Sequence, residues 1–260
     1  MTVREALGEA ERRLDAAGVE TPRVDAELLL AHVLGTTRSG VYAHLDRDVD
    51  GALEQLLRRR ESREPLAYVL GEWGFRHLTL KTDARALVPR PETEVVVDRC
   101  LALLAGSAAP RVLDIGVGSG AIALALKHER PDAEVVGVDV SPDALALARE
   151  NADGLGLDVD LHEGGPEAAV AGWDLVVSNP PYVDTLDGLQ PELDYEPREA
   201  LVGAGLHEEI ARAAATRFLV FEVGLGQARP VAAVLERCGY GAVTVTADLA
   251  GIERVVEGRR

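Results

Sequence analysis

The sequence contains few of the residues that redox, metal or membrane functions require. Its 260 residues include 2 cysteines, Cys100 and Cys238, which lie far apart and form no C-x-x-C pair. No disulfide framework or zinc site is therefore expected, and the 6 scattered histidines indicate no other metal site. No apolar run reaches the roughly 18 residues of a membrane helix, and the first residues lack the pattern of a signal peptide. We therefore expect a cytoplasmic protein with no membrane partner.

Positive charge is also scarce. The sequence has 27 Lys and Arg against 44 Asp and Glu, which gives a net charge of -17. Such a field repels phosphate backbones at long range, so the composition favours a protein or small-molecule partner over direct nucleic-acid binding. One local basic face would still suffice for nucleic acid, and an acidic proteome would explain the charge equally well. The composition favours a monomer.

Hydrophobic residues make up 47% of the sequence, which is enough for one large core or for a core with a small second domain. Helical patterns fill residues 1–73 and predict an N-terminal helical domain. Thr2 and Glu5 have the spacing of a capping box at the start of one helix. A second helix is expected to end at Gly35, and a third before Pro65.

The third helix carries three consecutive basic residues, Arg58, Arg59 and Arg60. Such a run could dock a partner. Three neighbours in a helix cannot all point in one direction, however, so the sequence predicts a solvated face.

Alternating apolar residues after this domain predict a β-hairpin linker over residues 74–90. One strand is expected through Phe75, Leu78 and Leu80, and a second through residues 86–88.

Strand and helix patterns then alternate over residues 91–260. This alternation is typical of an α/β fold with a Rossmann-like doubly wound sheet and helices on both faces. The predicted strands span residues 111–115, 135–140, 159–161, 174–177, 218–223 and 242–246.

A glycine-rich turn follows the first of these strands, in the sequence VLDIGVGSGAIALAL. Glycines leave no Cβ between the backbone and a ligand, and the helix that follows offers its N-terminal amides. An acid at the end of the next strand could accept both hydroxyls of a ribose. The residues predicted to hold a cofactor here are Asp114, Gly116, Val117, Gly118, Ser119, Gly120 and Asp139.

Two kinds of cofactor fit this turn. Gly116, Gly118 and Ala121 satisfy the dinucleotide pattern G-x-G-x-x-G/A, so a nicotinamide dehydrogenase is an alternative. Asp114 favours S-adenosylmethionine, because a carboxylate there could attract the amino group of the cofactor's methionine and would repel a pyrophosphate.

The sequence SNPPY, residues 178–182, follows the predicted strand at 174–177. Pro180 favours extended geometry at Asn179, and neither proline supplies an N–H. The backbone carbonyls and the Asn179 side-chain oxygen therefore suit a substrate –NH2 with two protons to donate. Tyr182 would give a flat wall for a planar group. We predict that Asn179, Pro180, Pro181 and Tyr182 bind the substrate, and that Asn179, Pro180 and Tyr182 take part in catalysis.

These motifs resemble those of amino-group methyltransferases that use S-adenosylmethionine. The pattern D-x-G-x-G-x-G followed by N-P-P-Y is similar to that of enzymes acting on adenine N6 or glutamine N5. Three further segments narrow the resemblance to the release factor glutamine methyltransferases of the HemK/PrmC family, over nearly the whole chain. They are LVPRPETE at residues 87–94, YEPREALVGAGL at 195–206 and DLAGIERVV at 248–256.

The resemblance implies an enzyme that methylates N5 of the glutamine in the Gly-Gly-Gln loop of peptide chain release factors. It implies a Rossmann-like methyltransferase domain over residues 91–260, N-terminal helices that recognise the release factor, and a contact of Asn179 with the cofactor. It also implies that Arg90, Glu92 and Thr93 form a loop near the active site, although that loop could equally be a salt-bridged linker. The alternatives are a ribosomal-protein glutamine or nucleic-acid adenine methyltransferase, or an inactive member that serves as a binding module.

Three features depart from the family pattern. In the segment HEGGPEAAV, Glu163 is the nearest acid for the adenine pocket, and no aromatic residue follows it. The stretch between Leu206 and Phe218 is short, so the family's long helix before the next strand is expected to be missing. Val117 replaces a small polar residue.

Overall fold

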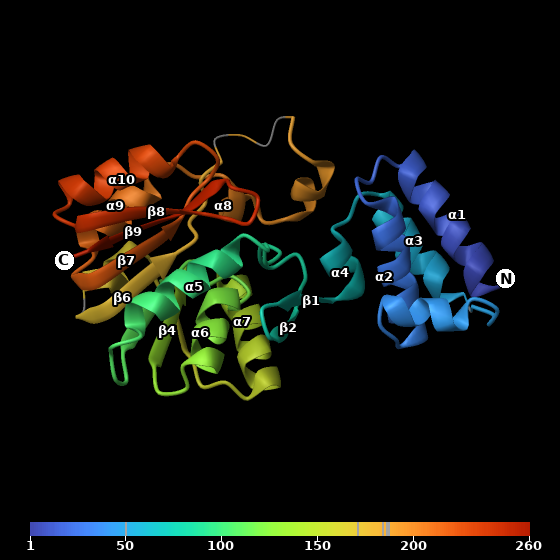
Figure 1. The fold of residues 1–260 in the computed structure, drawn as a ribbon, viewed down its shortest axis with the longest axis horizontal. Coiled ribbons are helices and arrows are strands. Elements are labelled where there is room, and N and C mark those ends of the chain that lie inside the picture. Colours follow the sequence, from blue (N-terminus) through green and yellow to red (C-terminus); the bar gives the residue numbers. More distant parts are fainter. Residues whose placement is uncertain (50, 171, 184, 186–187) are drawn as a thin grey trace. The chain divides into compact units, whose positions relative to one another are not determined.

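The computed structural model describes residues 1–49, 51–170, 172–183, 185 and 188–260. The chain forms two compact units (Figure 1). The first consists of Met1–Glu72 and Leu189–Tyr195, and the second of Trp73–Gly188 and Glu196–Arg260. The short segment Leu189–Tyr195 thus belongs to the helical unit although it comes late in the chain.

The first unit is built from short helices that bury apolar residues against one another. Thr2 Oγ1 accepts the Glu5 N–H at 3.3 Å and Glu5 Oε2 accepts the Thr2 N–H at 2.8 Å, which confirms the predicted capping box. Leu14, Leu29 and Leu30 are fully buried in the core of this unit. Its α-helices are α1 (Val3–Ala16), α2 (Pro22–Leu34), α3 (Ala52–Glu61) and α4 (Leu66–Leu70), and its 3-10 helices are η1 (Ser39–His44) and η3 (Pro191–Tyr195).

The arginine run on α3 does not form a solvated face, so that prediction is wrong for Arg60. The Arg60 side chain is buried, and it donates to Asp25 at 2.7 Å and to Glu192 at 2.8 Å. Arg59 is half-buried, and only Arg58 is largely exposed. Successive helical residues are about 100° apart around the axis, so the three arginines point in different directions, and Arg60 lies on the side that faces Asp25 of α2.

The second unit contains a seven-stranded sheet in the order β5-β4-β3-β6-β7-β9-β8. The first five strands in this order are parallel, and β9 runs antiparallel to both of its neighbours. The strands are β3 (Arg111–Ile115), β4 (Glu134–Asp139), β5 (Asp160–Glu163), β6 (Trp173–Ser178), β7 (Thr216–Glu222), β8 (Gly241–Ala247) and β9 (Glu253–Arg259).

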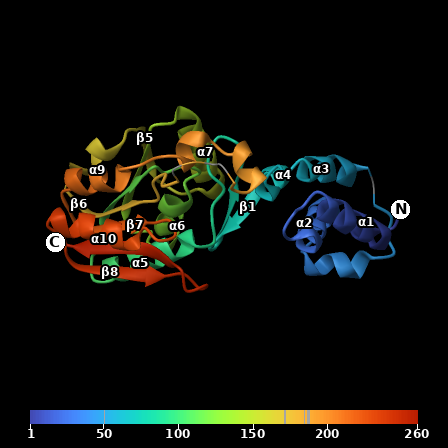
Figure 2. The ribbon, with the colours of Figure 1, turned by 90° about the horizontal axis from the view of Figure 1, so that it is seen from above.

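Helices cover both faces of this sheet, as Figures 1 and 2 show, and the predicted doubly wound α/β fold is confirmed. One face carries α5 (Thr93–Leu104), α6 (Ala121–Glu129) and α7 (Pro142–Leu155); the other carries α9 (Leu206–Ala213) and α10 (Ala228–Arg237). The remaining short elements are η2 (Pro166–Val170) and α8 (Arg198–Leu201). Among the described helices, none is both long and apolar enough to cross a membrane.

The hairpin before the sheet differs from the prediction. Its strands are β1 (Glu72–Phe75) and β2 (Leu78–Lys81), and residues 86–88 form no strand. The turn contains only Arg76 and His77, with Arg76 at a φ of 52°. Because a two-residue turn joins the strands directly, the alternation assigned to one strand covers both.

Two other elements of the second unit bear on the prediction, and one of them departs from it. Strand β9 was not predicted, because an acid and a glycine, Glu257 and Gly258, interrupt its apolar pattern. Glu257 is nevertheless buried, because it forms an ion pair with Arg99 at 2.7 Å. The stretch before β7 is short, as predicted, and in place of a long helix it holds α9, which has 8 residues. Its buried Ile210 and Ala211 belong to the core on that face of the sheet, so a short helix covers the sheet here.

Candidate active site

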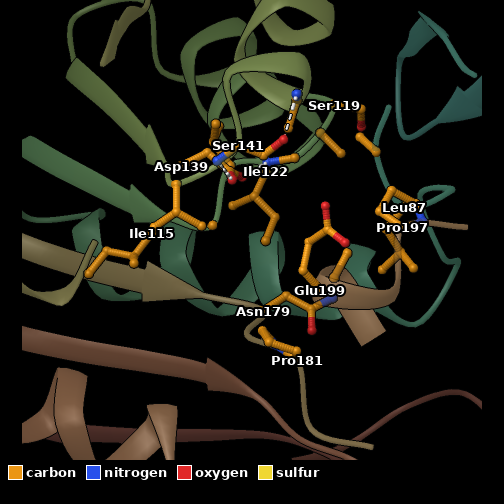
Figure 3. Close-up of a pocket in the computed structure, with 18 of the residues that line it drawn as sticks. Leu87, Ile115, Ser119, Ile122, Asp139, Ser141, Asn179, Pro181, Pro197 and Glu199 are labelled. Carbon is orange, nitrogen blue, oxygen red and sulfur yellow. Dashed lines mark hydrogen bonds between the residues drawn. The ribbon is translucent and has the colours of Figure 1, made fainter. Parts of the chain in front are cut away.

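The sheet has its topological switch point between β3 and β6, because the chain turns to one side after β3 and to the other after β6. Ligands of doubly wound folds bind at this point, outside the carboxyl ends of the strands. A cavity of about 310 Å³ lies here, and Figure 3 shows the residues around it. Its wall includes residues 85–90, 115–119, 139–141 and 164–166, together with Thr93, Asn179, Pro181, Pro197, Glu199 and Leu206.

The glycine-rich turn forms one side of this cavity. Gly116 and Gly120 have φ angles of 75° and 90°, in the left-handed region that favours glycine. A Cβ on Gly120 would lie 2.7 Å from Leu124 Cδ1, so packing also requires glycine there, whereas the space beside Gly116 is open. Asn151 holds the turn from α7, because its Nδ2 donates to the Ser119 carbonyl at 2.9 Å. The turn is thus fixed and can lie close to a ligand.

Asp139 ends β4 and lines the cavity. Its Oδ2 accepts the Gly118 N–H at 2.9 Å, and its Oδ1 accepts the Ser141 N–H at 2.9 Å. These bonds fix the carboxylate, and each oxygen keeps lone-pair capacity for another donor. The arrangement suits the two adjacent hydroxyls of a ribose.

Asp114 is placed differently from the other predicted cofactor residues. It is 1% exposed and is not among the described residues that line the cavity. Its Oδ2 accepts the Ala123 N–H at 3.1 Å, and its Oδ1 has no partner in the described chain. Burial raises the pKa of Asp114 to about 7. The carboxyl group therefore belongs to the packing between β3 and α6.

Glu163 also lies outside the cavity wall. It is exposed at the end of β5, where it pairs in register with Asp139. The residues that follow it, Gly164, Gly165 and Pro166, line the cavity in its place. Backbone and apolar surface thus occupy the position where an acid was predicted.

The SNPPY segment reaches the cavity through two of its residues, Asn179 and Pro181. Ser178 anchors the end of β6, because its Oγ donates to the Ile115 carbonyl at 2.7 Å. Pro180 and Tyr182 are not among the described lining residues. The family resemblance implied that Arg90, Glu92 and Thr93 form a loop near the active site. Arg90 and Thr93 line the cavity, whereas Glu92 does not.

Tyr182 is held between neighbouring segments. Its carbonyl accepts the Gln227 Nε2–H at 2.9 Å, and a Cβ on Gly224 would lie 2.9 Å from its Cδ2. Burial, with Glu222 nearby, raises the pKa of Tyr182 to about 12, so its hydroxyl is protonated at neutral pH.

Two carboxylates beside the site were not predicted. Glu196 has a fully buried side chain that pairs with Arg90 and accepts the Val88 N–H at 3.0 Å, so it ties residues 88–90 in place. Glu222 ends β7 and is 0% exposed. An acid that directly follows an apolar strand, as in the sequence FLVFE, is the signal that could have identified Glu222.

No group of three His, Cys, Asp or Glu side chains in the described ranges is arranged to hold a metal ion.

Two families of known proteins match this chain. The family described as "PrmC N-terminal domain" matches residues 5–71, and the family described as "Methyltransferase small domain" matches residues 96–194. The curated relatives include the "Release factor glutamine methyltransferase" of Deinococcus radiodurans, 42% identical over 100% of this chain and 99% of its own length. The protein of the same name from Geobacter sulfurreducens is 41% identical over 99% of this chain and 96% of its own length.

Solved structures share the fold at low identity. The hMettl16 catalytic domain in complex with MAT2A 3'UTR hairpin 1 is 15% identical over 78% of this chain and 80% of its own, with a TM-score of 0.58. The N-terminal domain of human METTL16 in complex with SAH is 15% identical over 70% of this chain and 76% of its own, with a TM-score of 0.52.

Proposed function

Because this chain belongs to the family of release factor glutamine methyltransferases, we infer that it transfers a methyl group from S-adenosylmethionine to a glutamine side-chain amide of a peptide chain release factor. The observation that carries this proposal is the meeting of three features at one cavity: the glycine-rich turn, Asp139, and the Asn179–Pro181 segment.

The cavity fits S-adenosylmethionine by the chemistry of its wall. The open space beside Gly116 and the fixed carboxylate of Asp139 suit the sugar end of a nucleoside. Apolar surface from Ile115, Val140 and Pro166 suits a flat base. Asp139, with residues 116–120, is therefore proposed to hold the cofactor. When bound, the cofactor supplies a methyl group on a positively charged sulfur.

The Asn179–Pro181 segment is proposed to hold the substrate amide. An amide nitrogen is a poor nucleophile, so positioning and electrostatics must carry the reaction. Asn179 Oδ1 and the carbonyl of Pro180 would accept the two protons of the substrate –NH2, while Tyr182 would confine the planar amide. The substrate nitrogen would take this methyl group, and the sulfur would be left as a neutral thioether. The nitrogen then loses a proton to water.

We propose that the substrate glutamine lies in the Gly-Gly-Gln loop, that the helices of the first unit help to recognise the release factor, and that the enzyme acts as a cytoplasmic monomer without direct nucleic-acid contacts. The net charge of -17 supports the last point, because it disfavours association with phosphate backbones.

Intact mass spectrometry of a release factor incubated with the enzyme and S-adenosylmethionine tests this function. We expect a mass increase of one CH2 that requires the enzyme. A release factor whose Gly-Gly-Gln glutamine is replaced by glutamate is the control and should show no increase. An unchanged mass of the unmodified release factor, with cofactor binding intact, would contradict the proposal.

A further inference from the structure

Glu222 is a buried carboxyl group at the sheet edge that carries the site. Its exposed fraction is 0%, and neither oxygen has a hydrogen bond of normal geometry to any described residue. Thr93 Oγ1, at the first residue of α5, is likewise buried without such a bond. Buried polar groups are nearly always hydrogen-bonded, and an unpaired one is costly. Two such groups together indicate a specific role.

Asn179, the residue directly after β6, and Glu222, the last residue of β7, occupy equivalent positions along the chain. Strands β6 and β7 pair in parallel, with Ser178 opposite Phe221, so these two residues come next on each strand. The residues two positions earlier on both strands belong to the core beneath α5. Side chains of a strand return to the same face every second residue, which places Asn179 and Glu222 on the face where α5 begins with Thr93.

We propose that Glu222 is a positioning residue that fixes the orientation of the Asn179 carboxamide. As a carboxylate, Glu222 accepts the Asn179 Nδ2–H and the Thr93 hydroxyl, and Asn179 Oδ1 then remains available to the substrate –NH2. In the flipped orientation, Asn179 would present its own –NH2 and could not accept a proton from the substrate. This inference rests on the proposed function, because it assigns Asn179 to the substrate amide.

The surroundings of Glu222 support a group that titrates near neutrality. Burial raises the pKa of Glu222 to about 7, against the effect of Thr93, which lowers it. Glu92 also raises this pKa, whereas Arg254 and Asn179 lower it.

Two further titratable side chains lie near Glu222, Tyr182 close to its carboxyl group and His207 at its backbone. Tyr182 is neutral at pH 7 because burial raises its pKa to about 12. His207, on α9, contacts the backbone carbonyl of Glu222 at 2.9 Å, and burial lowers its pKa, so it too is neutral there.

The sign of the pH dependence follows from these groups. Above the pKa of Glu222, the carboxylate accepts the Asn179 Nδ2–H, and Asn179 Oδ1 is free to accept a proton of the substrate –NH2. Below it, the protonated carboxyl group can itself donate, and the orientation of Asn179 is no longer fixed. Lowering the pH through about 7 should therefore reduce kcat.

The test measures kcat for release-factor methylation against pH, with the affinity for S-adenosylmethionine followed by calorimetry. We expect Glu222→Gln to lower kcat at pH 8 by about 10- to 100-fold, with cofactor affinity unchanged, and to abolish the inflection near pH 7. A variant with wild-type kcat and the wild-type inflection would overturn the proposal.

A matched pair at Thr93 keeps the proposal testable if Glu222→Gln does not fold. Thr93→Val removes the hydroxyl that stabilises the carboxylate, so the inflection should move to higher pH. Thr93→Ser keeps the hydroxyl and should keep the inflection. Identical inflections for both variants would overturn the role of Glu222, whereas no methylation by the wild-type enzyme would instead contradict the proposed function.

Discussion

At the scale of single residues, the site combines side chains that could be predicted from the sequence with others that could not. Asp139 and Asn179 were predicted, because each directly follows a strand in a motif whose residue types are tied to a ligand, and both line the cavity. Asp114 was predicted for the same reason, but its side chain is buried and accepts the Ala123 N–H of α6. Glu222 belongs to no motif, and its one signal in the sequence is that an acid directly follows an apolar strand. Its burial without a normal hydrogen bond to a described residue is seen only in the structure.

The role of Asp139 can be measured by cofactor binding. A hydrogen bond to a charged group contributes about 1.5–3 kcal/mol, so losing two ribose bonds should weaken binding of S-adenosylmethionine by at least about 100-fold. Calorimetric titration of Asp139→Ala should show this loss. Asp158→Ala removes the same charge at an exposed position outside the cavity wall and should bind as the wild type does. Equal affinities of the two variants would contradict the assignment.

At the scale of elements, hydrophobic periodicity predicted the parallel strands well, because each is a short apolar run bounded by turns. It failed where two short strands met at a two-residue turn, as at Arg76, and where a strand contained a buried acid, as at Glu257. In both cases, tertiary partners decide the structure. Neither the Arg60–Asp25 pair nor the Arg99–Glu257 pair can be inferred from a pattern along the chain.

The loop at residues 88–90 depends on the ion pair between Arg90 and Glu196. The Glu196 side chain is 0% exposed, and Arg90 is its charged partner. Removing one partner of a buried pair leaves an uncompensated charge and is expected to cost about 3 kcal/mol. We therefore expect Arg90→Ala to lower the free energy of unfolding by about that amount, as measured by urea denaturation.

A surface ion pair provides the control for this prediction. Arg212 is 72% exposed and pairs with Glu208 one turn away on α9, and such pairs contribute less than about 1 kcal/mol. If Arg90→Ala and Arg212→Ala destabilised the protein equally little, the loop would not depend on Glu196.

At the scale of the whole molecule, stability should depend on pH through Asp114. Burial raises the pKa of this carboxyl group from 3.8 to about 7. The folded protein binds the proton of Asp114 more tightly than the unfolded chain does. The stabilisation from this difference is present in full below the pKa of the unfolded state and is lost as the pH rises through the pKa of the folded state. The free energy of unfolding should therefore fall between about pH 4 and pH 7.

Urea denaturation of Asp114→Asn tests this prediction. The amide resembles the protonated acid, so the variant should match the wild type at pH 4 and exceed it at pH 8 by roughly 1–4 kcal/mol. Asp158→Asn, an exposed counterpart, should follow the wild type at both values. A variant at Asp114 that is less stable at pH 8 would show that the ionised group is favoured in the folded state.

The atom that receives the methyl group distinguishes a glutamine methyltransferase from its alternatives, and fragment mass spectrometry of the reacted release factor locates that atom. We expect one added CH2, confined to the glutamine of the Gly-Gly-Gln loop and located on its side-chain amide. The Asn179–Pro181 acceptors at the cavity are suited to that –NH2 group. A methyl group found on any other residue or on a carboxylate, or absent from the release factor, would contradict the account.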